Sequence, residues 1–273
     1  MRLKEALYAM RPLNCLLAAI AVFIGASISQ SSFAFEWNVL FAMIAAFFIC
    51  GGGQSINDYF DFELDQKKQK NKYASITSQN KKQLLGIALI FFIIGNAFAF
   101  LINHWTIGIA LGITILLIVY SWLLTKRKYI GNLVIALGTA LPLVFGAAVF
   151  VEFKVVIWLA AGAFLVNWAR EIVKDVEDIK ADQGQKTTLP MILKTKPLLL
   201  FVGILLAIAI VIVYVPIKLA IFGNIYFLVL VTIANALFIK AFLELHAYKP
   251  SNSQKTFKIA MALALLGFLV GIL

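Results

Sequence analysis

Nine long apolar segments divide this chain of 273 residues, and they limit its fold more than any other feature. Each is close to the roughly 20 residues that an α-helix needs to cross the apolar core of a bilayer. Unbroken apolar runs also exclude a transmembrane β-barrel, whose strands alternate apolar and polar residues. We therefore predict an all-α membrane protein, a bundle of nine transmembrane helices that forms a single domain over residues 1–273. The predicted helices lie near residues 13–29, 37–56, 84–102, 107–124, 131–151, 155–173, 197–215, 217–242 and 257–273.

Basic residues test this helix count, because Lys and Arg favour the cytoplasmic side of a membrane. With a cytoplasmic N-terminus, 22 of the 24 Lys and Arg residues fall on that side, and only Lys154 and Lys218 fall outside. We expect a multi-pass protein of the plasma membrane, with its N-terminus in the cytoplasm and its C-terminus outside. The net charge of +11 has the same origin, together with attraction to membrane lipids that carry anionic headgroups. It requires no nucleic-acid partner, and no protein partner is evident.

Two copies of the pattern Asp-x-x-Asp-x-x-x-Asp each follow a predicted helix directly. The chain has only 13 acidic residues, and nine of them lie in the stretches 58–65 and 171–182. Because four predicted helices separate the copies, both face the cytoplasm, where two long loops begin at about residues 57 and 170. The motif residues are Asp58, Asp61 and Asp65 in the first copy, and Asp175, Asp178 and Asp182 in the second.

The spacing of the motifs places their carboxylates together, because an α-helix turns by about 100° per residue and positions i, i+3 and i+7 share one face. Asn57, four residues before Asp61, adds an amide to the first face. Carboxylates this close repel one another, so they need a cation. Oxygen ligands without histidine or cysteine favour Mg²⁺, which binds one or two carboxylates together with substrate phosphate and water. We predict that all six aspartates are Mg²⁺ ligands and that the two faces clamp a diphosphate.

Other interpretations of the acidic motifs remain open. Lys174 lies four residues before Asp178 and Arg170 one turn further back, so part of the second motif could form ion pairs instead. A transporter or cation channel is an alternative because intramembrane acids often line ion pathways, although only Glu171 lies inside a predicted span. A CDP-alcohol phosphotransferase also uses clustered aspartates and Mg²⁺, but its Asp-Gly and Ala-Arg elements are absent here.

The two motifs and their places after the second and sixth helices resemble the UbiA superfamily of intramembrane prenyltransferases. Three more segments are similar to that superfamily: Arg11-Pro12-x-Asn14, Tyr120 with Lys126, and residues 170–178. Residues 170–178 look most like its archaeal digeranylgeranylglyceryl phosphate synthase branch. The resemblance implies a central cavity capped by the two cytoplasmic loops, and a polyprenyl diphosphate donor with a lipophilic acceptor. In that branch the donor group is geranylgeranyl and the acceptor is geranylgeranylglyceryl phosphate, which gives an ether lipid.

The resemblance also implies roles for individual side chains. Catalytic roles fall to Asn57, Asp61, Asp178 and Tyr120, with the tyrosine near the reactive carbon. Contacts with the diphosphate fall to Asn57, Lys126, Lys174, Arg170, Arg11, Asn14 and Lys72. Such enzymes usually carry Arg-Pro-x-Arg-Pro after the first motif, where this chain has Lys70 and Lys72. We expect these lysines to supply positive charge there, without the bidentate phosphate contacts of arginine.

Within the same superfamily, prenyltransferases with aromatic acceptors of the quinone or tocopherol type are the alternative. Haem farnesylation is disfavoured because the chain has only two histidines.

Overall fold

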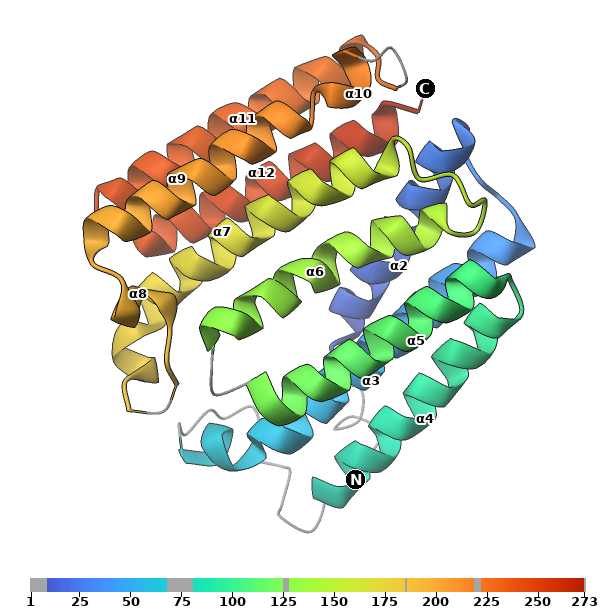
Figure 1. Ribbon diagram of the computed structural model, residues 1–273, viewed down its shortest axis with the longest axis horizontal. Helices are drawn as coiled ribbons and strands as arrows, with labels where there is room; N and C mark the ends of the chain where they lie inside the picture. The colour runs from blue at the N-terminus through green and yellow to red at the C-terminus, as the bar shows by residue number, and fades with distance from the viewer. Residues whose placement is uncertain (1–8, 68–80, 125–127, 185, 219–221, 273) are drawn as a thin grey trace.

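The computed structural model is a bundle of helices and describes residues 9–67, 81–124, 128–184, 186–218 and 222–272 (Figure 1). Within these ranges nine helices are long and apolar enough to cross a membrane, which confirms the predicted number. They are α2 (Pro12–Gln30), α3 (Trp37–Lys67), α4 (Lys81–Phe100), α5 (His104–Val119), α6 (Lys128–Ala147), α7 (Val156–Asp182), α9 (Thr195–Ile212), α11 (Ile225–His246) and α12 (Pro250–Val270). Shorter elements are the π-helical turn η3 (Tyr120–Leu124), α8 (Leu189–Ile192) and α10 (Val215–Lys218).

Helix α6 lies between two groups of helices (Figure 1). In one group α3 packs against α2, α4 and α5, and in the other α7 packs against α9 and α12. Helix α6 contacts α2 on one side and α7 on the other. Each group has its own cluster of buried apolar side chains. A third cluster joins the groups at the end of the bundle where Ile28 and Phe268 pack.

The two helices that carry the acidic motifs are longer than their apolar segments. Helix α3 continues to Lys67 and α7 to Asp182. The expectation that the loops begin at residues 57 and 170 is therefore wrong, and both motifs lie on continuous helical ends. The extensions contain neither Gly nor Pro, the two residues that most disfavour a helix interior. Continuous helix gives the motif side chains the shared faces that their spacing requires.

The predicted start of the eighth span, at residue 217, is also wrong, because α11 begins at Ile225. Asn224 caps this helix by accepting a hydrogen bond from the backbone N–H of Phe227 at 2.9 Å. Gly223 before it has φ 110°, a conformation that glycine adopts readily and other residues rarely do. The ninth span begins earlier than predicted, at Pro250, since proline is favoured at the first position of a helix.

Helices α2 and α6 cross closely at two glycines. A Cβ atom added to Gly25 would lie 2.0 Å from the carbonyl oxygen of Leu143, and one added to Gly146 would lie 2.0 Å from that of Val22. Small residues allow backbones to approach in this way in membrane helices. The crossing fixes α6 against α2, and so fixes the distance between the two groups of helices.

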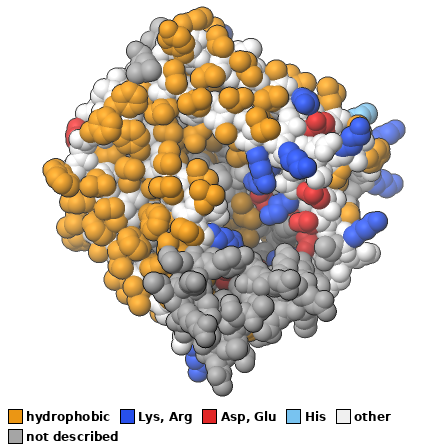
Figure 2. Space-filling model, turned by 180° about the vertical axis from the view of Figure 1, so that it is seen from behind, with side chains coloured by type: hydrophobic (Ala, Val, Ile, Leu, Met, Phe, Trp, Pro, Cys, Tyr) orange, Lys and Arg blue, Asp and Glu red, His pale blue; other side chains and the backbone are white. Residues whose placement is uncertain are grey.

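The outer surface is mostly apolar, as Figure 2 shows, and charged side chains gather toward one side of the molecule beside a hollow. Large exposed apolar residues occur on α2, α4, α5, α9 and α11. Trp37 and Trp105 are exposed near one end of their helices and Trp122 near the other, positions that suit aromatic side chains at the two membrane interfaces. The chain is therefore an integral membrane protein.

We predict that Gly146→Ala destabilises the bundle, because the added methyl group must push α2 and α6 apart. Overpacking of this kind costs about 1–3 kcal/mol, and a lower melting temperature in detergent would show it. Gly138→Ala in the same helix is the matched control, since a Cβ atom there meets nothing within 4 Å. Equal melting temperatures for the two variants would contradict the close crossing.

Candidate active site

The first two aspartates of the first acidic motif are buried in the bundle near the end of α3. Asp58 is fully buried and Asp61 is 7% exposed. Arg11, at the start of α2, donates from Nη2 to Asp58 Oδ1 at 2.8 Å and from Nη1 to Gln54. The backbone of Arg11 is left-handed, with φ 50°, which costs a residue other than glycine about 1–2 kcal/mol. The ion pair, buried on the Asp58 side and one-third exposed on the Arg11 side, offsets this strain and holds the guanidinium against the motif.

Asn57 supports Asp61 from the preceding turn of α3. Its Nδ2 donates to Asp61 Oδ2 at 3.5 Å, a long hydrogen bond. Its Oδ1 is buried and has no hydrogen-bond partner among the described residues. A buried acceptor without a hydrogen bond destabilises the fold by about 1–3 kcal/mol. A donor group or a metal ion bound to this oxygen would remove that cost.

The second acidic motif lies on α7 and is held by α6. Asp175 is fully buried, Asp182 is 4% exposed, and Asp178 is half-buried. Asn132 of α6 donates from Nδ2 to Asp175 Oδ2 at 2.7 Å. Asn132 could not be identified as a site residue from the sequence, because it lies at the start of an apolar segment and belongs to no motif. Its Oδ1, like that of Asn57, is buried without a partner in the described part of the chain.

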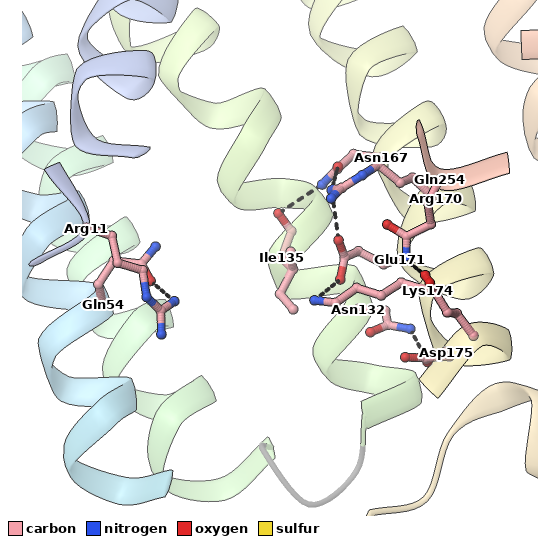
Figure 3. A network of polar contacts seen from close by, with 11 residues as sticks. Arg11, Gln54, Asn132, Ile135, Asn167, Arg170, Glu171, Lys174, Asp175 and Gln254 are labelled. Atoms are coloured by element: carbon pink, nitrogen blue, oxygen red, sulfur yellow. Dashed lines mark hydrogen bonds and ion pairs between the residues drawn. The ribbon is translucent and has the colours of Figure 1, made fainter. Parts of the chain in front are cut away.

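Arg170 and Lys174 form ion pairs with Glu171 on the same helix. Arg170 Nη1 lies 3.0 Å from Glu171 Oε1 and 3.4 Å from Asn167 Oδ1, and Lys174 Nζ lies 3.8 Å from Glu171 Oε2. Figure 3 shows this group on α7, opposite Arg11 and Gln54. Glu171 is 2% exposed and keeps the two cations beside the motif. The sequence analysis had considered pairs with the motif aspartates instead.

Tyr120 lies beside the helix of the first motif, because the turn that it begins contacts α3 and α6. It begins the π-helical turn η3 that ends α5, and such turns are frequent at functional sites. Asp61 of the first motif, and Glu171 and Asp175 on α7, are near enough for their charges to act on this side chain. One aromatic side chain therefore faces acids from both halves of the bundle.

A direct contact also joins the two halves at this point. Lys186, which follows α7, places Nζ 3.5 Å from Asp61 Oδ2 on α3. The contact shows that the segment after the second motif reaches the first. Lys186 could not be identified from the sequence, because it belongs to no motif and its partner Asp61 lies 125 residues away.

Several predicted site residues are not placed by these contacts. Asn14 is exposed on the first turn of α2, and no described hydrogen bond joins its side chain to either motif. Lys72 and Lys126 lie outside the described residues, and so does the side chain of Asp65. Their predicted roles remain predictions.

The donor set fits Mg²⁺ bound together with a phosphate ligand. In the described ranges no three His, Cys, Asp or Glu side chains surround one point, so no complete cage of protein ligands is present. Mg²⁺ does not need one, since it usually takes one or two carboxylates and completes its octahedron with phosphate and water. Buried carboxylates on α3 and α7, with the free Oδ1 atoms of Asn57 and Asn132 beside them, are oxygen ligands of this kind.

Comparison with known proteins shows the family of this chain. Residues 18–266 match the profile of the UbiA prenyltransferase family. The chain belongs to this family, and it is a prenyltransferase.

Particular relatives are similar over the whole chain. A digeranylgeranylglyceryl phosphate synthase of Thermococcus kodakarensis is 31% identical over 265 residues, which cover 95% of each chain. A solved structure of a digeranylgeranylglyceryl phosphate synthase has a TM-score of 0.86 and 32% identity, and covers 99% of this chain and 98% of that one. A UbiA homologue from Archaeoglobus fulgidus bound to DMAPP and Mg²⁺ has a TM-score of 0.69 and 19% identity, covers 98% of this chain and 99% of that one, and shares the fold.

We predict that Asn132→Ala lowers prenyl transfer about 10- to 100-fold, the usual effect of removing a group that orients a metal ligand. Asp175 would lose the hydrogen bond that fixes its carboxylate. Initial rates with purified protein measure the effect. Asn96→Ala is the control, because it removes a 2.9 Å hydrogen bond to Thr114 inside the bundle, away from both motifs. Similar rates for the two variants would show that Asn132 only stabilises the fold.

Proposed function

We propose that the chain transfers a geranylgeranyl group from its diphosphate to the free hydroxyl of geranylgeranylglyceryl phosphate, a step of ether-lipid synthesis. The observation that supports this proposal is the 3.5 Å contact between Asp61 of the first motif and Lys186, which follows the second motif in the chain. The relative of T. kodakarensis, similar along nearly its whole length, bears the name of an enzyme of this kind.

Mg²⁺ is the proposed cofactor. The solved homologue from A. fulgidus contains Mg²⁺ together with DMAPP, which supports the assignment. In this chain Asp58, Asp61 and Asp65 would hold the metal on the α3 side, and Asp175, Asp178 and Asp182 on the α7 side. When bound, Mg²⁺ neutralises negative charge on the departing diphosphate.

The protein's own groups bind and orient the reactants. Arg11, Asn57 and Asn132 hold the carboxylates in position, and Asp61 and Asp178 are the aspartates on which we expect turnover to depend most. The C–O bond to the diphosphate breaks with its electron pair leaving on oxygen. The acceptor oxygen then bonds to the same carbon and releases its proton.

Tyr120 and the apolar bundle protect the reacting carbon. Loss of diphosphate from an allylic carbon leaves positive charge there, which the face of an aromatic ring attracts. The position of Tyr120 near acids of both motifs suits this role. Further diphosphate contacts are proposed for Arg11, Arg170 and Lys174, and for Asn14, Lys72 and Lys126.

We also propose that the motif end of the bundle faces the cytoplasm, in the plasma membrane. Arg11 contacts Asp58 at this end, whereas α12 ends at the opposite one, where Asn224 donates to the carbonyl of Val270. The N-terminal end would then be cytoplasmic and the C-terminal end outside. The distribution of Lys and Arg supports this orientation.

The test is mass spectrometry of the products formed from geranylgeranyl diphosphate and Mg²⁺ with a panel of acceptors. We expect the ether formed from geranylgeranylglyceryl phosphate, and no product after EDTA treatment until Mg²⁺ is restored. A prenylated hydroxybenzoate as the main product would identify an aromatic-acceptor enzyme instead. Turnover that is insensitive to chelation would contradict the metal assignment.

Aspartate variants in the same assay test the site itself. Asp61→Ala and Asp178→Ala should each lower the rate by roughly 10²–10³, the usual loss when one charge-stabilising group is removed from an active site. Glu152→Ala is the matched control, since this partly exposed acid lies in the segment before α7, at the far end of that helix. Full turnover by either aspartate variant would remove that residue from the proposed site.

A further inference from the structure

Lys186 contacts one of the two carboxylate oxygens of Asp61, a predicted metal ligand. Its Nζ lies 3.5 Å from Asp61 Oδ2, the same oxygen that accepts from Asn57. Both side chains are largely buried, with 17% of Lys186 and 9% of Asp61 exposed. The contact is thus partly shielded from solvent, and it spans from the end of α7 to α3.

The backbone that carries Lys186 is anchored. Its N–H donates to the carbonyl of Asp182 at 3.1 Å, which ties the residue to the last turn of α7. Thr188 is fully buried, and Leu189 and Leu193 pack on the apolar cluster between α7 and α9. The lysine side chain, which has four rotatable carbons and three donors, can therefore leave Asp61 while this backbone stays in place.

Lys186 and Mg²⁺ cannot share Asp61 without cost. Mg²⁺ takes its ligand oxygens at about 2.0–2.1 Å, so both cations would approach the same carboxylate and repel each other. A diphosphate removes the conflict, because it brings several negative charges and oxygens that can accept from an ammonium group. Lys186 can then leave Asp61 for the diphosphate.

We propose that Lys186 is a positioning residue that holds Asp61 until the diphosphate arrives and then binds the diphosphate itself. The proposal rests on the proposed function, since it assumes a metal-bound diphosphate between the motifs. Its consequence is that Mg²⁺ and diphosphate each strengthen the binding of the other. Such coupling is reciprocal and typically amounts to about 5- to 150-fold in affinity.

Calorimetry on the full chain in detergent tests this coupling, with Mg²⁺ alone and with inorganic pyrophosphate at saturating Mg²⁺ as probes. Lys186→Met removes the ammonium group and keeps a side chain of similar length. We expect it to bind Mg²⁺ alone about fivefold more tightly and pyrophosphate about tenfold more weakly, at the lower end of the coupling range. Lys194→Met is the control, because Lys194 is exposed just before α9 on the same side of the bundle, and both of its affinities should match the wild type.

A merely structural ion pair gives a different pattern. It would make Lys186→Met weaken both affinities together, with a lower melting temperature, and that result would overturn the proposal. Unchanged affinities would overturn it as well. Lys186→Arg keeps the positive charge, so its affinities for Mg²⁺ and for pyrophosphate should stay within the same order of magnitude as those of the wild type. This variant provides a second test if the Met variant folds poorly. If the wild type itself binds no pyrophosphate with Mg²⁺, it is the proposed function that fails.

Discussion

The cost of burying carboxylates in an apolar bundle governs the rest of this structure. An ionised carboxylate taken out of water without a partner is strongly destabilising, and breaking a buried ion pair leaves such a charge behind. Asp58 is held by Arg11, Asp61 by Lys186 and Asn57, and Asp175 by Asn132. These contacts come from α2, α3, α6 and the segment after α7, so the helices around the site are organised by the needs of its acids.

The same acids explain why the site joins two halves of the molecule. Helices α3 and α7 belong to separate packing groups, and α6 stands between them. The glycine crossing of α2 with α6 sets how closely the groups approach. Because both motif helices continue past their apolar segments, the carboxylates project at the end of the bundle, where a charged ligand can enter and an apolar tail can remain within the helices.

Much of the fold follows from local sequence patterns. Apolar length predicts the nine spans, and the spacing of the aspartates predicts their common helical faces, since both depend on residues near one another in the chain. The contacts that build the site were not predictable in this way. Asn132 and Lys186 carry no motif, and their partners Asp175 and Asp61 are 43 and 125 residues away. Arg170 and Lys174 could be assigned a charge from the sequence, but their pairing with Glu171 depends on side-chain conformation.

We propose that two acidic motifs, distant in the sequence, bind one metal-bound diphosphate between them. Crystals grown with Mn²⁺ in place of Mg²⁺ and an unreactive prenyl diphosphate analogue test it directly, since Mn²⁺ gives an anomalous signal. We expect anomalous peaks between α3 and α7, with carboxylate oxygens from both motifs bound to metal on either side of a single diphosphate. Metal or diphosphate at one motif alone, with the other motif turned away, would contradict it.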